Sequence, residues 1–229
     1  MRAGRHNSGM KLAILGLFIG SVQPMPDDGR PTAIFKRPVR GAVDIGPQGL
    51  HGDTQADRRF HGGPDKAVHH YPLENLRRLA QQFPQIADRL LSGALGENVS
   101  TEGADESAVC IGDVFALGSA RVQLCQPRTP CWKIEARHGV DGMTRYIAEH
   151  GICGWYYRVL TPGSAAVGDA IELIEREPAP VSLRQFWDLV GAHRPALDAL
   201  TRLIDTPALN EDWRHRLQQR RRWLMTQGD

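Results

Sequence analysis

The sequence predicts a mainly β protein with α-helical additions: a closed β-barrel followed by a small C-terminal unit of three helices. Short apolar segments separated by Gly and Pro turns continue to about residue 176, which is typical of all-β folds. Two helical segments interrupt this pattern, and helices can pack outside a sheet that closes on itself. Beyond residues 177–180 the apolar periodicity becomes helical, so this Pro-rich segment is interpreted as a linker.

The strands follow from short apolar runs and from alternation of apolar and polar residues. The clearest pair flanks Gly118-Ser119, a two-residue hairpin turn of the Gly-X kind. The last strand, 168–175, alternates cleanly and should be half-buried. Strands are expected at 11–20, 32–37, 41–45, 113–117, 120–125 and 168–175.

Helices are predicted from caps and proline positions. Pro72 suits the first turn of a helix that runs to residue 82, and Pro84 ends it. A second helix is expected from a cap at Asp141 to His150. In the C-terminal part, Ser182 caps the first helix, residues 195–204 form the second, and the third follows Asn210.

These elements predict three parts of the chain: a disordered leader at 1–10, a barrel domain at 11–178 and a three-helix unit at 182–225. The apolar run 12–20 follows basic residues, as in a signal peptide. No small-residue cleavage site follows it, however, and the run is too short to cross a bilayer. A buried first strand and a cytoplasmic protein are therefore expected.

Charge and cysteine usage exclude several classes of function. Lys and Arg number 28 and Asp and Glu 26, so the net charge of +2 gives no reason to expect nucleic acid or a membrane as partner. The four cysteines form no C-x-x-C pair, which argues against a structural zinc site. The last helix is rich in arginine. Its basic face could be solvated, contact an electron-donor protein or, as a lesser alternative, bind nucleic acid.

The densest polar and glycine-rich cluster spans residues 49–72. Glycines allow a ligand to approach the backbone N–H groups, and nearby cations suit an anion such as a phosphate. If 67–71 is a strand, His69 and His70 point to opposite faces, and only one can line a given pocket. A solvated turn with ordinary surface charges is the alternative. The candidate ligand-binding residues here are Arg58, Arg59, His61, Gly62, Gly63, Lys66, His69 and His70.

A second cluster surrounds Cys131, in the stiff segment Pro-Arg-Thr-Pro-Cys-Trp-Lys133. Pro130 restricts the backbone that leads to the cysteine, and Arg128 and Lys133 flank it. Cations near a thiol favour the thiolate, which is the form that binds a metal or attacks an electrophile. A buried, inert cysteine in a proline-braced turn is an equally good interpretation of the spacing.

A third cluster, Leu95-Gly-Glu-Asn-Val-Ser-Thr101, contains Asn98. A primary amide offers donors and an acceptor, which can read the edge of a heterocycle or orient a substrate. A turn that precedes a strand explains the same residues.

Together the three clusters resemble the MOSC-domain family, and within it the YiiM-like type. The resemblance rests on G-L-x-G-D-x-x-A-D, then H-G-G-P-D-K-A-V-x-H-Y-P, G-E-N-V-S-T and Q-P-R-T-P-C-W-K, in this order, and on Gly154-Trp-Tyr-Tyr-Arg158. It runs from about residue 14 to 225. It implies a MOSC-type β-barrel that binds the molybdenum cofactor (molybdopterin), with Cys131 as the protein sulfur on the metal.

The resemblance further implies a molybdenum-cofactor oxidoreductase that reduces N-hydroxylated compounds, such as hydroxylaminopurine-type base analogues, and so detoxifies them. Cys131, Asn98 and His70 would be catalytic, and Arg128 would join the cluster at 58–69 in holding the cofactor. Electrons would come from a separate reductase protein, because the chain has no Rossmann, haem or Fe–S motif. A cofactor or sulfur carrier without turnover is the alternative, and a homodimer is an open option.

Overall fold

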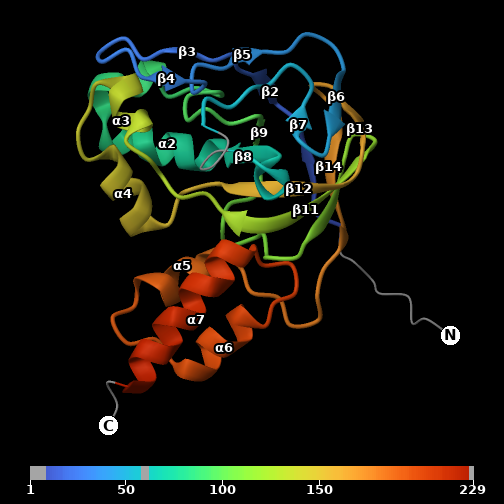
Figure 1. Ribbon diagram of the computed structural model, residues 1–229. Helices are drawn as coiled ribbons and strands as arrows, with labels where there is room; N and C mark the ends of the chain where they lie inside the picture. The colour runs from blue at the N-terminus through green and yellow to red at the C-terminus, as the bar shows by residue number, and fades with distance from the viewer. Residues whose placement is uncertain (1–8, 58–61, 227–229) are drawn as a thin grey trace, which may run out of the picture.

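The computed structural model describes residues 9–57 and 62–226 (Figure 1). Most of the expected leader, residues 1–8, lies outside the described part. Across the described residues no helix is both long and apolar enough to span a bilayer.

The strands are short and belong mainly to one sheet. They are β1 (Lys11–Ala13), β2 (Gly16–Ile19), β3 (Gln23–Pro24), β4 (Pro31–Thr32), β5 (Arg37–Pro38), β6 (Val43–Gly46), β7 (Gly49–Leu50), β8 (Val68–Pro72), β9 (Val99–Thr101), β10 (Val114–Leu117), β11 (Ala120–Pro127), β12 (Trp155–Thr161), β13 (Gly163–Ala165) and β14 (Ala170–Glu175). The hairpin predicted at Gly118-Ser119 is confirmed, since β10 and β11 pair antiparallel across it. The strand predicted at 32–37 is wrong for residues 33–36, which connect β4 to β5.

The helices gather at one side of the sheet and below it (Figure 1). They are the 3-10 helices η1 (Pro64–Lys66) and η2 (Pro84–Arg89), and the α-helices α2 (Leu73–Gln82), α3 (Lys133–His138), α4 (Met143–His150), α5 (Leu183–Gly191), α6 (Leu197–Ile204) and α7 (Glu211–Thr226). The capping role predicted for Ser182 is confirmed: its hydroxyl accepts from the Gln185 N–H, and the Gln185 side chain accepts from the Ser182 N–H.

The predicted closed barrel is wrong, because the sheets are open and mixed. The main sheet has the order β1-β14-β10-β11-β12-β8-β9-β2-β5, and within the described residues no ladder joins its edges β1 and β5. The first apolar run breaks at residues 14–15, so β1 pairs with β14 while β2 pairs with β9 and β5. Strands β8 and β9 are parallel, and the others in this sheet pair antiparallel. Short strands in a sequence do not reveal whether the two edges pair, which is why closure was wrongly expected.

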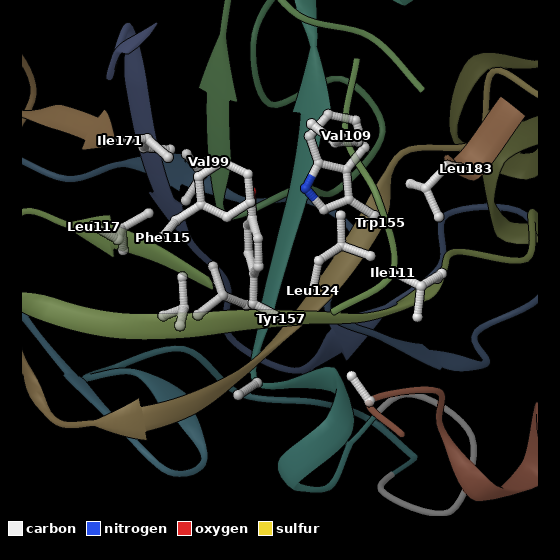
Figure 2. Packing of buried hydrophobic residues seen from close by; sticks show 14 of the residues in the cluster. Val99, Val109, Ile111, Phe115, Leu117, Leu124, Trp155, Tyr157, Ile171 and Leu183 are labelled. Carbon is white, nitrogen blue, oxygen red and sulfur yellow. The ribbon is translucent and has the colours of Figure 1, made fainter. Parts of the chain in front are cut away.

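The main hydrophobic core lies against this sheet and continues into the C-terminal helices. Phe115 and Tyr157 contact edge to face, with ring centroids 5.7 Å apart, beside the buried Trp155 (Figure 2). Leu183 of α5 and Leu203 of α6 belong to the same cluster of buried residues. A second cluster packs α2, η2, α3 and α4 together. The C-terminal helical unit (α5, α6 and α7) is therefore bound to the sheet by shared apolar burial.

The arginines of α7 explain how this unit holds together. Arg214 donates to the main-chain carbonyls of Ile204, Thr206, Pro207 and Leu209, at the end of α6. Guanidinium groups stabilise the carbonyl end of a helix both by hydrogen bonding and by charge. Arg220 does the same for α5, where it donates to the carbonyls of residues 189, 190 and 192. Much of the basic character of α7 is thus directed into the protein.

Candidate functional site

A pocket opens where the 33–36 connection, the 53–56 segment, η1, β8 and the loop after β11 converge. Its ionisable and polar lining is rich in cations. The main such residues are Lys36, Asp53, Lys66, His69, Asn98, Arg128, Cys131, Lys133 and Tyr156. A larger hollow between residues 177–181 and helices α5 and α6 is lined mainly by Pro, Ala and aliphatic side chains. The first pocket is therefore the candidate for chemistry.

One wall of the pocket is a buried polar network around Asp53. Its Oδ2 atom accepts from Lys36 Nζ at 2.6 Å and from Asn98 Nδ2 at 2.9 Å, and its Oδ1 atom accepts from the Gly20 N–H at 2.6 Å. The exposed fractions of the Lys36 and Asp53 side chains are 9% and 3%. Burial lowers the pKa of Lys36, and the charge of Asp53 opposes that shift.

Asn98 ties this network to strand β8. Its Nδ2 atom also donates to the Phe18 carbonyl at 3.1 Å, and its Oδ1 atom accepts from the His69 N–H at 3.0 Å. Asn98 therefore lines the pocket, but its amide already makes hydrogen bonds to β2, β8 and Asp53. This suits a positioning role better than direct reading of a ligand edge.

His69 and His70 lie on opposite faces of β8, and His69 is the one that lines the pocket. Burial, and next the charge of Arg128, hold the pKa of His69 well below its ordinary value, so this imidazole is neutral. His70 lies on the core side, where its ring nitrogens contact the Tyr157 hydroxyl at 3.0 Å and the Thr101 hydroxyl at 2.8 Å. Burial lowers the pKa of His70 to about 3. The structure thus does not bring His70 to the pocket.

Arg128 follows β11 and directs its buried guanidinium to the pocket. Its Nη2 atom donates to the Leu95 carbonyl at 3.3 Å, while its Nη1 atom has no hydrogen-bond partner among the described residues. His69 Nε2 is likewise buried without a partner there. A buried cation with an unsatisfied donor destabilises the fold unless a ligand accepts a hydrogen bond from that donor, and an anion would both accept the bond and balance the charge.

Cys131 lies in the loop between β11 and α3, and its side chain lines the pocket. It is partly exposed, whereas Cys110, Cys125 and Cys153 are buried. Burial raises the pKa of the Cys110 thiol to about 11 and that of Cys125 to about 12. It also raises the pKa of Cys153. Among these four thiols, Cys131 is the one placed to meet a ligand.

The glycine-rich cluster contributes only in part. Gly63 precedes η1 with φ of 96°, a conformation that favours glycine, and Lys66 at the end of η1 lines the pocket. Gly62 and Gly63 are partly buried but do not line it. Arg58, Arg59 and His61 lie outside the described residues.

Among the ionisable residues that line the pocket, Lys36, Asp53 and Tyr156 were not predicted. Asp53 stands within the glycine-rich cluster, and its carboxylate could have been noted there. Alternation predicts only that Tyr156 faces away from Trp155 and Tyr157. The register of β12 against β8 places it opposite His69, with ring centroids 5.0 Å apart. Lys36 has no local signal, since only the tertiary fold joins it to Asp53.

Part of the main sheet and part of the pocket, including Arg128 and Cys131, fall within a known domain. Residues 57–172 match the MOSC domain family, and the chain belongs to that family. Its similarity to YiiM proteins extends over nearly the whole chain. Protein YiiM of Escherichia coli (strain K12) is 35% identical over 206 residues, which cover 90% of this chain and 91% of that one. The crystal structure of YiiM from Geobacillus stearothermophilus has a TM-score of 0.77 at 29% identity, covering 91% of this chain and 98% of that chain.

A third relative has a name that describes an activity. A protein called Reductase from Gibberella moniliformis (strain M3125 / FGSC 7600) is 31% identical over 177 residues. These residues are 77% of this chain and 31% of that protein, so the similarity concerns one part of a longer polypeptide.

Proposed function

We propose that the chain binds a molybdenum cofactor in this pocket and reduces N-hydroxylated compounds such as hydroxylaminopurine-type bases. One observation carries the proposal: the same pocket is lined by a partly exposed thiol, Cys131, and by the buried guanidinium of Arg128, whose Nη1 atom has no partner in the part of the chain that the structure describes. A thiolate suits a soft or high-valent metal, and a guanidinium suits a phosphate or another anionic group. Membership of the MOSC family and the reductase-named relative support it.

The residues present fit such a cofactor. Cys131 would supply sulfur to the metal, and Arg128, Lys66 and Lys133 would hold the anionic part. His69 Nε2, which has no hydrogen-bond partner within residues 9–57 and 62–226, can exchange a hydrogen bond with the pterin or with a substrate. When bound, the cofactor supplies the two-electron redox chemistry that no side chain here provides.

The chain itself would position the substrate and manage protons. Reduction of an N–OH group to N–H consumes two electrons and two protons and releases water. The Lys36 ammonium, held by Asp53 at 2.6 Å, places a proton donor in the wall of the pocket. A separate donor protein would deliver the electrons.

The proposal is tested on chain produced in cells that make the cofactor. Molybdenum per chain and reduction of 6-hydroxylaminopurine by a chemical reductant are measured for wild type, Cys131→Ser and Cys110→Ser. Cys110 is the matched control because its thiol lies outside the pocket. We expect Cys131→Ser alone to lose both signals. Full molybdenum and activity in Cys131→Ser would overturn the assignment. A wild type that transfers cofactor to an apo-enzyme but reduces nothing would favour the carrier alternative.

A further inference from the structure

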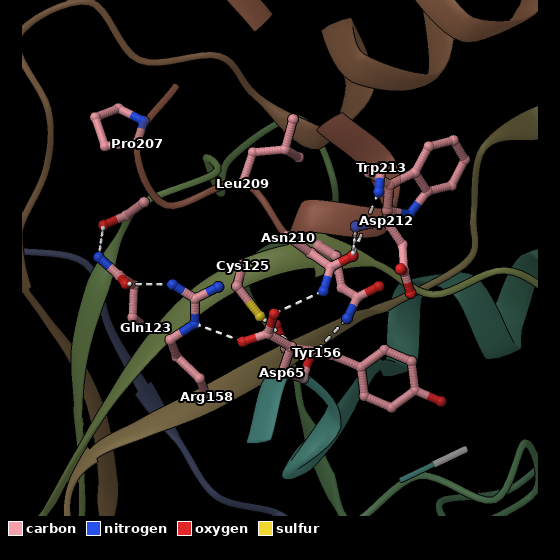
Figure 3. A network of polar contacts seen from close by, with 12 residues as sticks. Asp65, Gln123, Cys125, Tyr156, Arg158, Pro207, Leu209, Asn210, Asp212 and Trp213 are labelled. Atoms are coloured by element: carbon pink, nitrogen blue, oxygen red, sulfur yellow. Dashed lines mark hydrogen bonds and ion pairs between the residues drawn. The ribbon is translucent and has the colours of Figure 1, made fainter. Parts of the chain in front are cut away.

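A polar junction joins the C-terminal helical unit to the loop that carries Lys66 (Figure 3). At its centre is Asp65 of η1. Its Oδ1 atom accepts from Arg158 Nε at 2.8 Å, and its Oδ2 atom accepts from Asn210 Nδ2 at 2.6 Å. Asp65 and Asn210 are 145 positions apart, so this contact exists only because the helical unit is docked.

The main chain of the same loop is also held. The Asp65 carbonyl accepts from Gln126 Nε2 at 2.9 Å and from the Cys125 thiol at 3.2 Å, both on β11. The Lys66 N–H donates to the Gly63 carbonyl at 3.0 Å and closes the turn. Side-chain and main-chain contacts of Asp65 therefore set where the next residue, Lys66, enters the pocket.

Asn210 makes hydrogen bonds to three elements, α7, β11 and η1. Its Oδ1 atom accepts from the N–H groups of Asp212 and Trp213 at 3.0 and 3.4 Å, as an N-cap of α7 does. Its own N–H donates to the Cys125 carbonyl at 2.9 Å. Because the capping contacts occupy Oδ1, the amide can present only its Nδ2 donor to Asp65. Asn210 is 7% exposed, so water does not readily replace these contacts.

We infer that Asn210 is a positioning residue for the cationic side of the pocket, acting through Asp65 on the backbone that carries Lys66. The C-terminal helical unit then contributes to the site, because it holds in place the loop to which an anionic ligand binds. The role toward an anionic cofactor rests on the proposed function. That Asn210 holds the loop through Asp65 rests on the hydrogen bonds alone.

Two substitutions separate the contact of Asn210 with Asp65 from its capping of α7. Asn210→Ser keeps a hydroxyl that caps α7 but is too short to reach Asp65. Asn210→Asp also keeps a good cap, yet it turns a carboxylate toward the carboxylate of Asp65 and replaces attraction with repulsion. Ser182→Ala is the matched control, because it removes an N-cap from α5 in the same unit and does not touch Asp65.

Hydrogen exchange followed by mass spectrometry tests whether Asn210 holds the loop, with molybdenum content as a second readout. We expect the amides of residues 62, 63 and 65–67 to exchange about tenfold faster in Asn210→Ser, and faster still in Asn210→Asp, since a lost hydrogen bond to a charged group has about this effect. In Ser182→Ala these amides should exchange as in wild type. Both Asn210 variants should also retain less molybdenum than Ser182→Ala does.

Wild-type exchange at residues 62, 63 and 65–67 in both Asn210 variants would overturn the inference. So would equal acceleration in Ser182→Ala, because the effect would then be general loosening of the unit. A wild-type chain that binds no molybdenum would refute the proposed function, while the exchange data would still decide whether Asn210 holds the loop.

Discussion

Replacing Asp53 by Asn tests how the wall of the pocket is held. The substitution keeps the size of the side chain and an oxygen that can accept from the Gly20 N–H. It removes the negative charge that lies 2.6 Å from the Lys36 ammonium. Lys36 would then remain a buried cation, since its side chain is only 9% exposed.

The expected loss is large because one charge of a buried pair is left alone. Breaking such a pair costs about 3–5 kcal/mol of unfolding free energy, and we expect about 3 kcal/mol here because the Gly20 contact survives. Adding Lys36→Met removes the stranded charge. The double variant Lys36→Met/Asp53→Asn should therefore be more stable than Asp53→Asn by about 2 kcal/mol.

The pH dependence gives a second, independent signal. Burial already lowers the pKa of Lys36, and loss of Asp53 lowers it further. Between this lowered pKa and the ordinary value of 10.5, the unfolded chain binds a proton that the folded chain does not, so stability rises with pH. Asp53→Asn should accordingly recover part of its loss, by up to about 1.4 kcal/mol per pH unit, between pH 7 and pH 9.

Urea unfolding followed by circular dichroism at both pH values measures these effects. The double variant serves as the reference for the pH dependence because it lacks the amine at position 36. The reasoning fails if Asp53→Asn loses less than about 1 kcal/mol and its pH profile is parallel to that of the double variant.

Two further predictions concern other parts of the chain. Arg214→Ala should lower the unfolding free energy by about 2–4 kcal/mol, because four carbonyls near the end of α6 each lose a hydrogen bond from its guanidinium. Arg222→Ala, at an exposed position of the same helix, should change it by less than about 0.5 kcal/mol in the same urea titration; similar losses would contradict the capping role. The burial that lowers the pKa of His70 from 6.5 to about 3 means that the unfolded chain takes up an extra proton below pH 6.5, so stability falls on acidification. His70→Gln should reduce the loss between pH 7 and pH 5 by about 2 kcal/mol, and an unchanged profile would show that His70 does not titrate this way.

Several features of the fold could be predicted because they depend on neighbouring residues. The Gly118-Ser119 hairpin and the capping box of Ser182 involve atoms within a few positions of each other, and both are present. The candidate thiol could be picked out in the same way, since a cysteine that follows two prolines and lies between Arg128 and Lys133 is a local pattern. Order and type of side chain were sufficient for these features.

Which residues face the pocket could be decided only from the tertiary structure. Alternation predicts that His69 and His70 diverge, but the packing of β8 between β9 and β12 decides that His69 lines the pocket. Likewise, five arginines on one helix predict a basic surface, whereas the docking of α7 against α5 and α6 turns Arg214 and Arg220 into caps for those helices.

The sequence by itself determined the family and most of the helices of this protein, and it supplied Cys131 and Arg128 as candidate site residues. Only the tertiary structure decided that the main sheet stays open and that Lys36 pairs with Asp53. It also placed Asn210 against Asp65 from 145 positions away. The physical reason is that strand-edge pairing and buried charge pairing depend on which distant segments meet. Local propensity and spacing do not contain that information.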